Sequence, residues 1–290
     1  MTSIVLPNNI REISGNVFEK SDITEIILND GLEKIGDCCF LDSKIKNINF
    51  PSSLKYIGKA VFQDCMQLEN VDISQTQIEV ISESAFIDSG LKEIILPSNL
   101  KEIASQAFYG TANLQNISIS RSTTVIGNKA FYNSGLTSIT LHNGLNTIGY
   151  MAFANCTGLT KISKTSESTN TGGRILIGAF QDCTSLTEAT LPDNITTMEG
   201  YTFIGCEKLG KIILPKNLKS IGDLGLRTNY DVSTIVFNSL EIPVLSNIPD
   251  SSIPNVLPFV DNINEILVPS QSVEEYKNRL TSYANKIKGF

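Results

Sequence analysis

The stretch that decides the fold is residues 91–108, which reads Leu-Lys-Glu-Ile-Ile-Leu-Pro-Ser-Asn-Leu-Lys-Glu-Ile-Ala-Ser-Gln-Ala-Phe. The spacing of Ile94 and Leu96 predicts a short strand, with both side chains inward and Ile95 outward between them. Pro97 should end this strand, because proline cannot donate a hydrogen bond to a neighbouring strand. A second apolar series then leads through Ile103 to the closing Ala-Phe pair.

The closing phenylalanine recurs along most of the chain. Its column reads Phe18, Phe40, Phe62, Phe86, Phe108, Phe131, Phe153, Phe180 and Phe203, with Leu226 as the next member. One such unit offers about six apolar side chains, each worth roughly 1.5–3 kcal/mol when buried. Ordering its backbone costs on the order of 1–2 kcal/mol per residue. A lone unit therefore stays unfolded, and the units must stack on one another.

The unit L-x-x-I-x-L-P-x-x-L-x-x-I-G-x-x-A-F-x-x-C resembles the BspA-like class of leucine-rich repeats. The resemblance implies a leucine-rich-repeat solenoid of the α/β-type repeat class, with mostly short parallel β-strands, turns and short helical segments. About ten repeats fit residues 4–237. Proteins of this class are mostly described as bacterial surface adhesins. The resemblance therefore implies a secreted or cell-surface protein that binds a macromolecular partner.

Two segments organise the chain. We expect the solenoid to span residues 1–238 and a capping segment to span residues 239–290. Residues 239–262 lose the period and gain prolines, which predicts an irregular wrap, followed by a strand near residues 263–268. A helix should begin at Ser272, with Glu275 completing a capping box. Its apolar face should comprise Val273, Tyr276, Leu280, Tyr283, Ala284 and Ile287.

Two local departures from the repeat are expected to matter. The first repeat starts at residue 3 or 4 without a polar cap, so we expect that a signal sequence was removed ahead of it. A self-capping intracellular array is the alternative. The polar insertion at residues 164–173 should leave the solenoid, either as a ligand-contacting loop or as a tolerated one.

Charge and composition narrow the function. The net charge is −7 at pH 7, which argues against nucleic acid and against docking on anionic lipid. No apolar run reaches the roughly 18 residues of a membrane span. No cofactor, metal or catalytic motif is recognised. The single histidine, His142, precedes the turn residues Asn143 and Gly144, and is predicted to be exposed.

The cysteines share a structural slot. Four of the six stand three residues after the repeat phenylalanine, where other repeats have Ser or Thr, which predicts a small, mostly buried position. Stacked coils would place three of them close enough for disulfides, but their parallel side-chain directions favour free thiols. The four cysteines that follow the repeat phenylalanine in this way are Cys65, Cys156, Cys183 and Cys206.

The outward strand positions form a ladder that should tile the concave sheet, the usual binding face of a solenoid. The candidate ligand-binding residues are Asn49, Asp72, Ile95, Asn116, Ser118, Ser138, Thr140, Lys161, Ser163, Thr190 and Ile213, with Ile27 and Val236 toward the ends of the ladder. Their amides and hydroxyls suit an extended peptide or a glycan, although they are also ordinary solvated strand residues. The ladder lacks tyrosine and tryptophan, so a protein partner is favoured over a glycan. The alternatives are a glycan-binding module, a spacer that projects another domain, and, least favoured, an enzyme.

Overall fold

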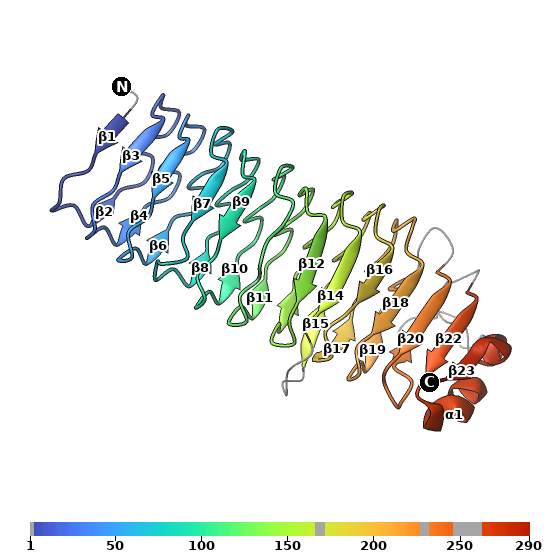
Figure 1. Cartoon of the computed structure of the whole chain (residues 1–290). Helices are drawn as coiled ribbons and strands as arrows, with labels where there is room; N and C mark the ends of the chain where they lie inside the picture. Colours follow the sequence, from blue (N-terminus) through green and yellow to red (C-terminus); the bar gives the residue numbers. More distant parts are fainter. Residues whose placement is uncertain (1–2, 166–171, 227–231, 246–262) are drawn as a thin grey trace. The chain divides into compact units, whose positions relative to one another are not determined.

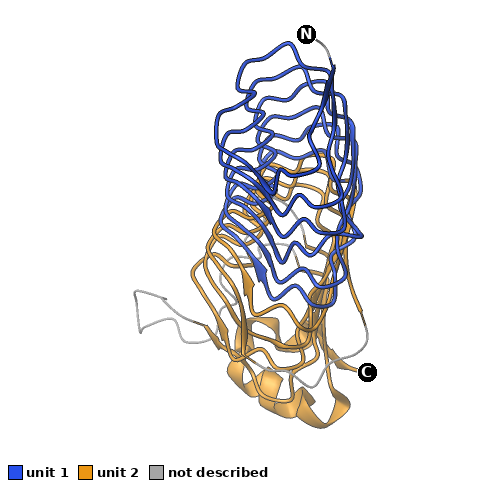
Figure 2. Cartoon of the chain, turned by 90° about the vertical axis from the view of Figure 1, so that its left-hand side faces the viewer, with its two compact units in different colours: residues 1–136 blue, residues 137–290 orange. Residues whose placement is uncertain are grey.

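The computed structural model describes residues 3–165, 172–226, 232–245 and 263–290. The chain forms stacked coils of short parallel strands, which confirms the predicted repeat fold, with about 11 turns and little helix. It divides into two compact units, residues 1–136 and 137–290 (Figure 2). In each unit the strands lie in two rows, because most coils contribute one strand to each row (Figure 1).

The first row of unit 1 contains the predicted strands. Each is a triplet whose outer residues are exposed, as the alternation predicted, and whose middle residue is buried in all but β1, where it is half-buried. Ile26 of β3, for example, pairs in register with Ile4 and Ile48 and is 2% exposed. The strands are β1 (Ser3–Val5), β3 (Glu25–Ile27), β5 (Asn47–Asn49), β7 (Asn70–Asp72) and β9 (Glu93–Ile95).

The second row of unit 1 consists of two-residue strands that the sequence did not predict. Each arises where the second isoleucine of the repeat points inward and the residue before it points outward. The strands are β2 (Glu12–Ile13), β4 (Lys34–Ile35), β6 (Tyr56–Ile57), β8 (Val80–Ile81), β10 (Glu102–Ile103) and β11 (Val125–Ile126).

Unit 2 repeats the same arrangement with longer strands. Its first row is a seven-stranded parallel sheet of β12 (Ser138–Leu141), β14 (Lys161–Lys164), β16 (Glu188–Thr190), β18 (Lys211–Leu214), β20 (Thr234–Phe237), β22 (Glu265–Val268) and β23 (Ile287–Gly289). Its second row comprises β13 (Thr147–Ile148), β15 (Gly173–Ile175), β17 (Ile195–Met198), β19 (Ser220–Ile221) and β21 (Val244–Leu245).

The repeat phenylalanines form the spine of the core. Within unit 1 the rings from Phe18 to Phe131 stack on their neighbours at centroid distances of 5.1–5.4 Å. Within unit 2, Phe180 stacks on Phe153 at 5.2 Å and on Phe203 at 5.6 Å. From Phe40 onward these side chains are fully buried. Each coil thus buries its ring against the coil before it and the coil after it.

The segment around each phenylalanine is a turn, so the short helical segments expected within the repeats are wrong for the described residues. In a typical coil Ala60 and Asp64, on either side of Phe62, have φ angles of 50° and 58°. A right-handed helix requires negative φ throughout. Two left-handed residues per coil therefore replace a helical turn, and each turn hydrogen-bonds to the next coil, as Phe62 N does to Ala85 O at 2.8 Å.

The glycine after the second isoleucine allows consecutive coils to approach closely. At Gly58 the φ angle is not positive, and an added Cβ would fall on the backbone of Gly36 and Asp37. The glycine is therefore required by the close approach of consecutive coils.

The predicted strand and helix are present, but the helix ends at Arg279, so the second half of its expected apolar face is wrong: Tyr283 and Ala284 lie in a 3-10 segment and Ile287 begins a strand. After β22 come a short 3-10 turn η1 (Ser270–Ser272), α1 (Val273–Arg279), a second 3-10 segment η2 (Thr281–Lys286) and β23. Tyr276 is buried, and its hydroxyl donates a hydrogen bond to Ser239 O at 3.1 Å. The capping box is wrong, because the Ser272 hydroxyl donates instead to Leu240 O at 2.8 Å, which ties the helix to the last coils.

Several predictions concern residues that are only partly described. Residues 166–171 of the insertion and residues 246–262 of the expected wrap lie outside the described residues. The boundary between solenoid and capping segment at residues 238 and 239 stays a prediction. Among the helices that are described, none is long and apolar enough to cross a membrane.

Candidate functional site

The exposed ladder of unit 1 is where several predicted site residues come together. Asn49, Asp72 and Ile95 end their strands with exposed side chains, as predicted. Asn116 and Ser118 are exposed as well, but residues 114–120 form no strand. The first row of unit 1 is therefore interrupted, and β7 and β9 form a separate two-stranded sheet.

A first groove lies at the break between β5 and β7. No strand pairing joins these two strands, although β5 pairs with β3 and β7 with β9. The groove has a volume of about 430 Å³. Its lining includes Asn47, Asn49, Asn70, Asp72, Gln75 and Ile95. Amide side chains, which both donate and accept hydrogen bonds, thus line an open strand edge.

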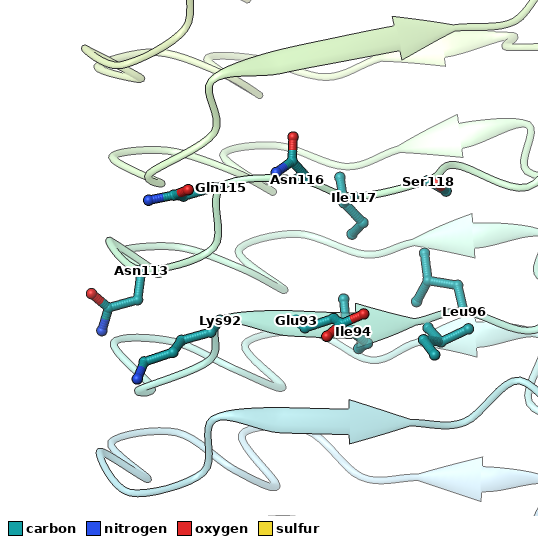
Figure 3. A pocket seen from close by; sticks show the side chains of 10 residues that line it. Lys92, Glu93, Ile94, Leu96, Asn113, Gln115, Asn116, Ile117 and Ser118 are labelled. Atoms are coloured by element: carbon teal, nitrogen blue, oxygen red, sulfur yellow. The ribbon is translucent and has the colours of Figure 1, made fainter.

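A second groove lies between β9 and residues 113–118, and its volume is about 550 Å³. Figure 3 shows that its lining side chains come from two successive coils, with Lys92 and Asn113 at one end of the groove and Leu96 and Ser118 at the other. Gln115 and Asn116 contribute two more amides. The second groove therefore repeats the chemistry of the first.

Glu93 and Ile95 belong to both grooves. Both lie on β9, and Ile95 is 47% exposed, which is high for a β-branched apolar residue. The two grooves are therefore neighbouring parts of one surface, which we call the ladder site. It is defined by the linings of the two grooves, with β9 between them.

The ladder site carries negative charge. The backbone N–H of Ser74 donates to Asp72 Oδ1 at 2.9 Å, and this hydrogen bond lowers the pKa of the Asp72 carboxyl below its ordinary value. Asp72 is thus ionised at neutral pH. Lys92, at the end of the second groove, forms an ion pair with Glu69 at 2.8 Å. The outward strand positions of β3, β5, β7 and β9 hold Glu25, Asp72 and Glu93 and no basic residue.

Sequence reasoning found the exposed residues but missed the breaks in the row. One signal was present: the turn from Phe62 to Asn70, and that from Phe108 to Asn116, is one residue longer than the turn from Phe86 to Glu93. At each break, the segment on the C-terminal side of the break directly follows one of these longer turns. The signal is insufficient by itself, because Phe153 also begins a longer turn and β14 nevertheless pairs with β12 in full register.

The predicted site residues in unit 2 lie on a continuous sheet. Ser138 and Thr140 of β12 are exposed and pair in register with Lys161 and Ser163 of β14. Lys161 forms an ion pair with Glu188 at 3.3 Å.

Further along this row the ladder becomes less accessible. Ser163, Thr190 and Ile213 are half-buried rather than exposed. Val236 is 8% exposed, so its predicted outward position is wrong. All three residues 235–237 of β20 are buried, and β20 lies between β18 and β22.

The prediction of an exposed histidine is also wrong. His142 is 5% exposed, and its Nδ1 accepts a hydrogen bond from Gly144 N at 3.0 Å. The adjacent Asn143 donates to Thr165 O at 3.1 Å and accepts from Asp193 N at 2.6 Å. These contacts from later coils cover a corner that its local sequence marks as a surface turn.

The cysteine slot is buried, as predicted. Cys65, Cys183 and Cys206 are fully buried thiols. Each donates to the carbonyl oxygen of the repeat phenylalanine in the coil before its own: Phe40 at 2.9 Å, Phe153 at 3.2 Å and Phe180 at 3.1 Å. Burial raises the pKa of Cys65 to about 11 and that of Cys39, in the alanine slot, to about 12.

These pKa values predict the reactivity of the thiols. At pH 8 Cys65 and Cys39 should resist alkylation in the folded protein, because only the thiolate reacts, while the half-buried Cys38 should react first.

The same pKa values predict how stability depends on pH. Since the buried thiols stay protonated when folded and ionise near 9.0 when unfolded, the free energy of unfolding should fall as the pH rises from 9 toward 11. Mass spectrometry of alkylated protein and unfolding curves at each pH check both statements. Rapid labelling of Cys65 at pH 8 would contradict them.

Among the described residues no group of three or more His, Cys, Asp or Glu side chains is placed to hold a metal ion. The ladder site combines amides, carboxylates and an exposed isoleucine on short strands. Such a surface can donate and accept hydrogen bonds along an extended ligand.

Comparison with known proteins agrees with this geometry. The family described as BspA type leucine rich repeat region matches in six copies, over residues 1–110, 79–177, 101–227 and 167–285. No curated protein matches.

Among solved structures, a leucine-rich repeat protein from Bacteroides ovatus is 23% identical, with a TM-score of 0.51, over 100% of this chain and 84% of that one. A leucine-rich repeat protein from Eubacterium ventriosum is 19% identical, with a TM-score of 0.51, over 79% of this chain and 77% of that one. Both likenesses concern the fold. The repeat, the stacked coils and the family match together establish that this chain belongs to the BspA-type leucine-rich repeat family.

Proposed function

We propose that this protein is a non-enzymatic, secreted or cell-surface, adhesin-like module that binds a protein partner through the ladder site. The observation that carries the proposal is the pair of grooves that share Glu93 and Ile95. Beside the grooves β5 pairs only with β3, and β7 and β9 pair only with each other, next to polar side chains.

The chemistry of the ladder site favours an extended protein segment. Backbone amides of such a segment can hydrogen-bond to the asparagine and glutamine side chains, as in strand addition to an open edge. An apolar side chain of the partner can cover Ile95, which is 47% exposed. Lysine or arginine on the partner would complement the ionised Asp72 and the carboxylate of Glu93.

Selection from a display library of random peptides tests this proposal. We expect the intact chain to enrich peptides that combine β-branched or aromatic residues with lysine or arginine. Glu93→Lys should weaken binding of an enriched peptide at least tenfold, because it reverses the charge shared by both grooves. Glu102→Lys, the same charge change on β10 in the second row, is the matched control and should bind as the unaltered chain does.

The outcomes separate the alternatives. Failure to enrich any peptide, or equal binding by Glu93→Lys, would count against a protein partner at the ladder site. Binding to a glycan array that Glu93→Lys removes would replace the protein partner with a sugar. For the location, an antibody against this chain should label intact cells of the organism that encodes it. Labelling only after lysis would contradict a surface position.

A further inference from the structure

The first row of unit 1 carries the same pair of exposed side chains on two of its strands. The sequence Glu-Ile-Ile forms both β3 and β9, and in each strand the glutamate and the second isoleucine are exposed. Ile27 is 51% exposed and Ile95 is 47% exposed. We call Glu25 and Ile27 the β3 anchor, and Glu93 and Ile95 the β9 anchor. The β9 anchor belongs to the ladder site, whereas the β3 anchor lies outside it.

Polar strands separate the two anchors. Between them lie β5 and β7, whose outward positions hold three amides and one carboxylate: Asn47, Asn49, Asn70 and Asp72. β3 pairs in register with β5, and β7 pairs in register with β9 (Figure 1). The first groove, about 430 Å³ in volume, lies at the break between β5 and β7. The two anchors therefore lie on opposite sides of this break, each one strand away from it.

The glutamates of the two anchors have no ion-pair partner within the part of the chain that the structure describes. Two other described strands of the first row carry a glutamate, and in both a lysine of a neighbouring strand neutralises it. Glu188 pairs with Lys161 at 3.3 Å, and Glu265 pairs with Lys288 at 3.4 Å. The first row thus pairs its own glutamates in unit 2 but leaves two carboxylates in unit 1 available to an outside cation.

One anchor suits the side chain of a single arginine or lysine. Its glutamate and isoleucine stand two residues apart on one strand, which separates them by about 6–7 Å. Long basic side chains cover apolar surface with their methylene stems and direct the charged head elsewhere. The stem can therefore cover the exposed isoleucine while the head pairs with the carboxylate. Arginine fits best, because its guanidinium can bind a carboxylate through two parallel hydrogen bonds.

The separation of the anchors sets the spacing of the two basic residues. β3 and β9 are three strand positions apart, and neighbouring strands lie about 4.8 Å apart, so the anchors are separated by roughly 14–15 Å. An extended segment advances about 3.4 Å per residue, and every second side chain lies on the same face. Two side chains four residues apart are then about 14 Å apart on one face. Spacings of two and six residues give about 7 Å and 20 Å, which do not match.

The surface between the anchors favours an extended segment over a helix. The first groove is lined by amide side chains, among them Asn49 and Asn70, which both donate and accept hydrogen bonds. An extended segment presents its backbone N–H and C=O groups to these amides, whereas a helix uses these groups for its own hydrogen bonds. Resting on the proposed function, we propose that the binding surface extends to the β3 anchor. Its partner is an extended protein segment that crosses the strands and places two arginines or lysines, four residues apart, on the two anchors.

Three synthetic peptides of identical composition test the spacing. Each contains two arginines, four threonines and one serine with blocked ends, and the arginines stand two, four or six residues apart. We expect the intact chain to bind the peptide with a spacing of four at least fivefold more tightly than the other two, because only this peptide reaches both anchors. The peptides have equal charge, so general attraction to a chain of net charge −7 is the same for all three. Fluorescence anisotropy of labelled peptide, titrated with protein from about 1 μM to 1 mM, measures each Kd.

Two variants locate the β3 anchor. Glu25→Gln should weaken the peptide with a spacing of four at least fivefold, to the level of the other two peptides, because one arginine loses its carboxylate. Ile27→Ser should weaken it at least twofold, because the arginine stem loses its apolar contact. Both side chains are exposed, so both variants should fold normally. Glu102→Gln, the same change on β10 in the second row, is the matched control and should leave the binding of all three peptides unchanged.

The outcomes distinguish this inference from the proposed function. Equal binding of the three peptides, binding of none, or unchanged binding by Glu25→Gln would overturn the crossing segment and its second anchor. Peptides from the display library that lose binding with Glu93→Lys but keep it with Glu25→Gln would leave the ladder site in place and remove the β3 anchor alone. A library that enriches no peptide would instead count against the proposed function.

Discussion

Replacing Phe108 with alanine should lower the free energy of unfolding by roughly 3–5 kcal/mol, the usual cost of truncating a core phenylalanine. Its ring is fully buried between Phe86 at 5.4 Å and Phe131 at 5.1 Å. Alanine would leave a cavity that the neighbouring coils cannot close, because their spacing is fixed by backbone hydrogen bonds on both sides. Urea unfolding monitored by circular dichroism measures the loss.

Two companion variants separate the stack from the cavity. Phe108→Leu keeps most of the volume and should cost clearly less than Phe108→Ala. Ser118→Ala, on the exposed ladder of unit 1, should change stability by less than about 0.5 kcal/mol. A loss below about 1 kcal/mol for Phe108→Ala would contradict the expected cost of a buried cavity. It would mean that the phenylalanine column does not stabilise the core.

Replacing Gly58 with alanine should also be strongly destabilising, although it adds only one methyl group. The added Cβ would fall on backbone atoms of Gly36 and Asp37, which no side-chain rearrangement can move. Overpacking typically costs about 1–3 kcal/mol, and we expect the upper part of that range because two coils must separate. The midpoint of chemical or thermal unfolding measures the effect.

The matched control is Gly210→Ala. There the added Cβ would lie 3.7 Å from Ser233 Oγ and 3.9 Å from Thr187 O, which are ordinary contacts. Removing backbone freedom from the unfolded chain should leave stability unchanged or slightly raised. Equal losses at the two glycines would show that coil spacing is not the reason for glycine at position 58.

Most of the interior could be predicted from the sequence, because the same requirement recurs in every coil. Ile26, Ile48 and most of their equivalents are buried as the alternation predicts, although Ile4 and Ile117 are half-buried. Because the coils are alike, the phenylalanine of each repeat occupies the equivalent buried position. The prediction failed at the turn around it, where the family resemblance implied a short helical segment but left-handed residues such as Ala60 and Asp64 prevent one.

Predictions about individual surface residues were less secure. Asn49, Asp72 and Ile95 are exposed as expected, since alternation along a strand decides this locally. His142 was read as a surface residue from its turn-forming neighbours, yet contacts of the adjacent Asn143 with Thr165 and Asp193 show that later coils cover this corner. Burial there depends on residues 22 and 50 positions away, which local pattern does not reveal.

By itself the sequence determined the repeat, the parallel stacking of its strands and the identity of the buried columns. A periodic apolar pattern has only one way to bury every copy of itself, and this explains that success. Only the tertiary structure decided where neighbouring strands fail to pair, and so where the grooves of the ladder site open beside Glu93 and Ile95. Whether neighbouring strands pair depends on contacts between coils, which the pattern within a single repeat does not specify.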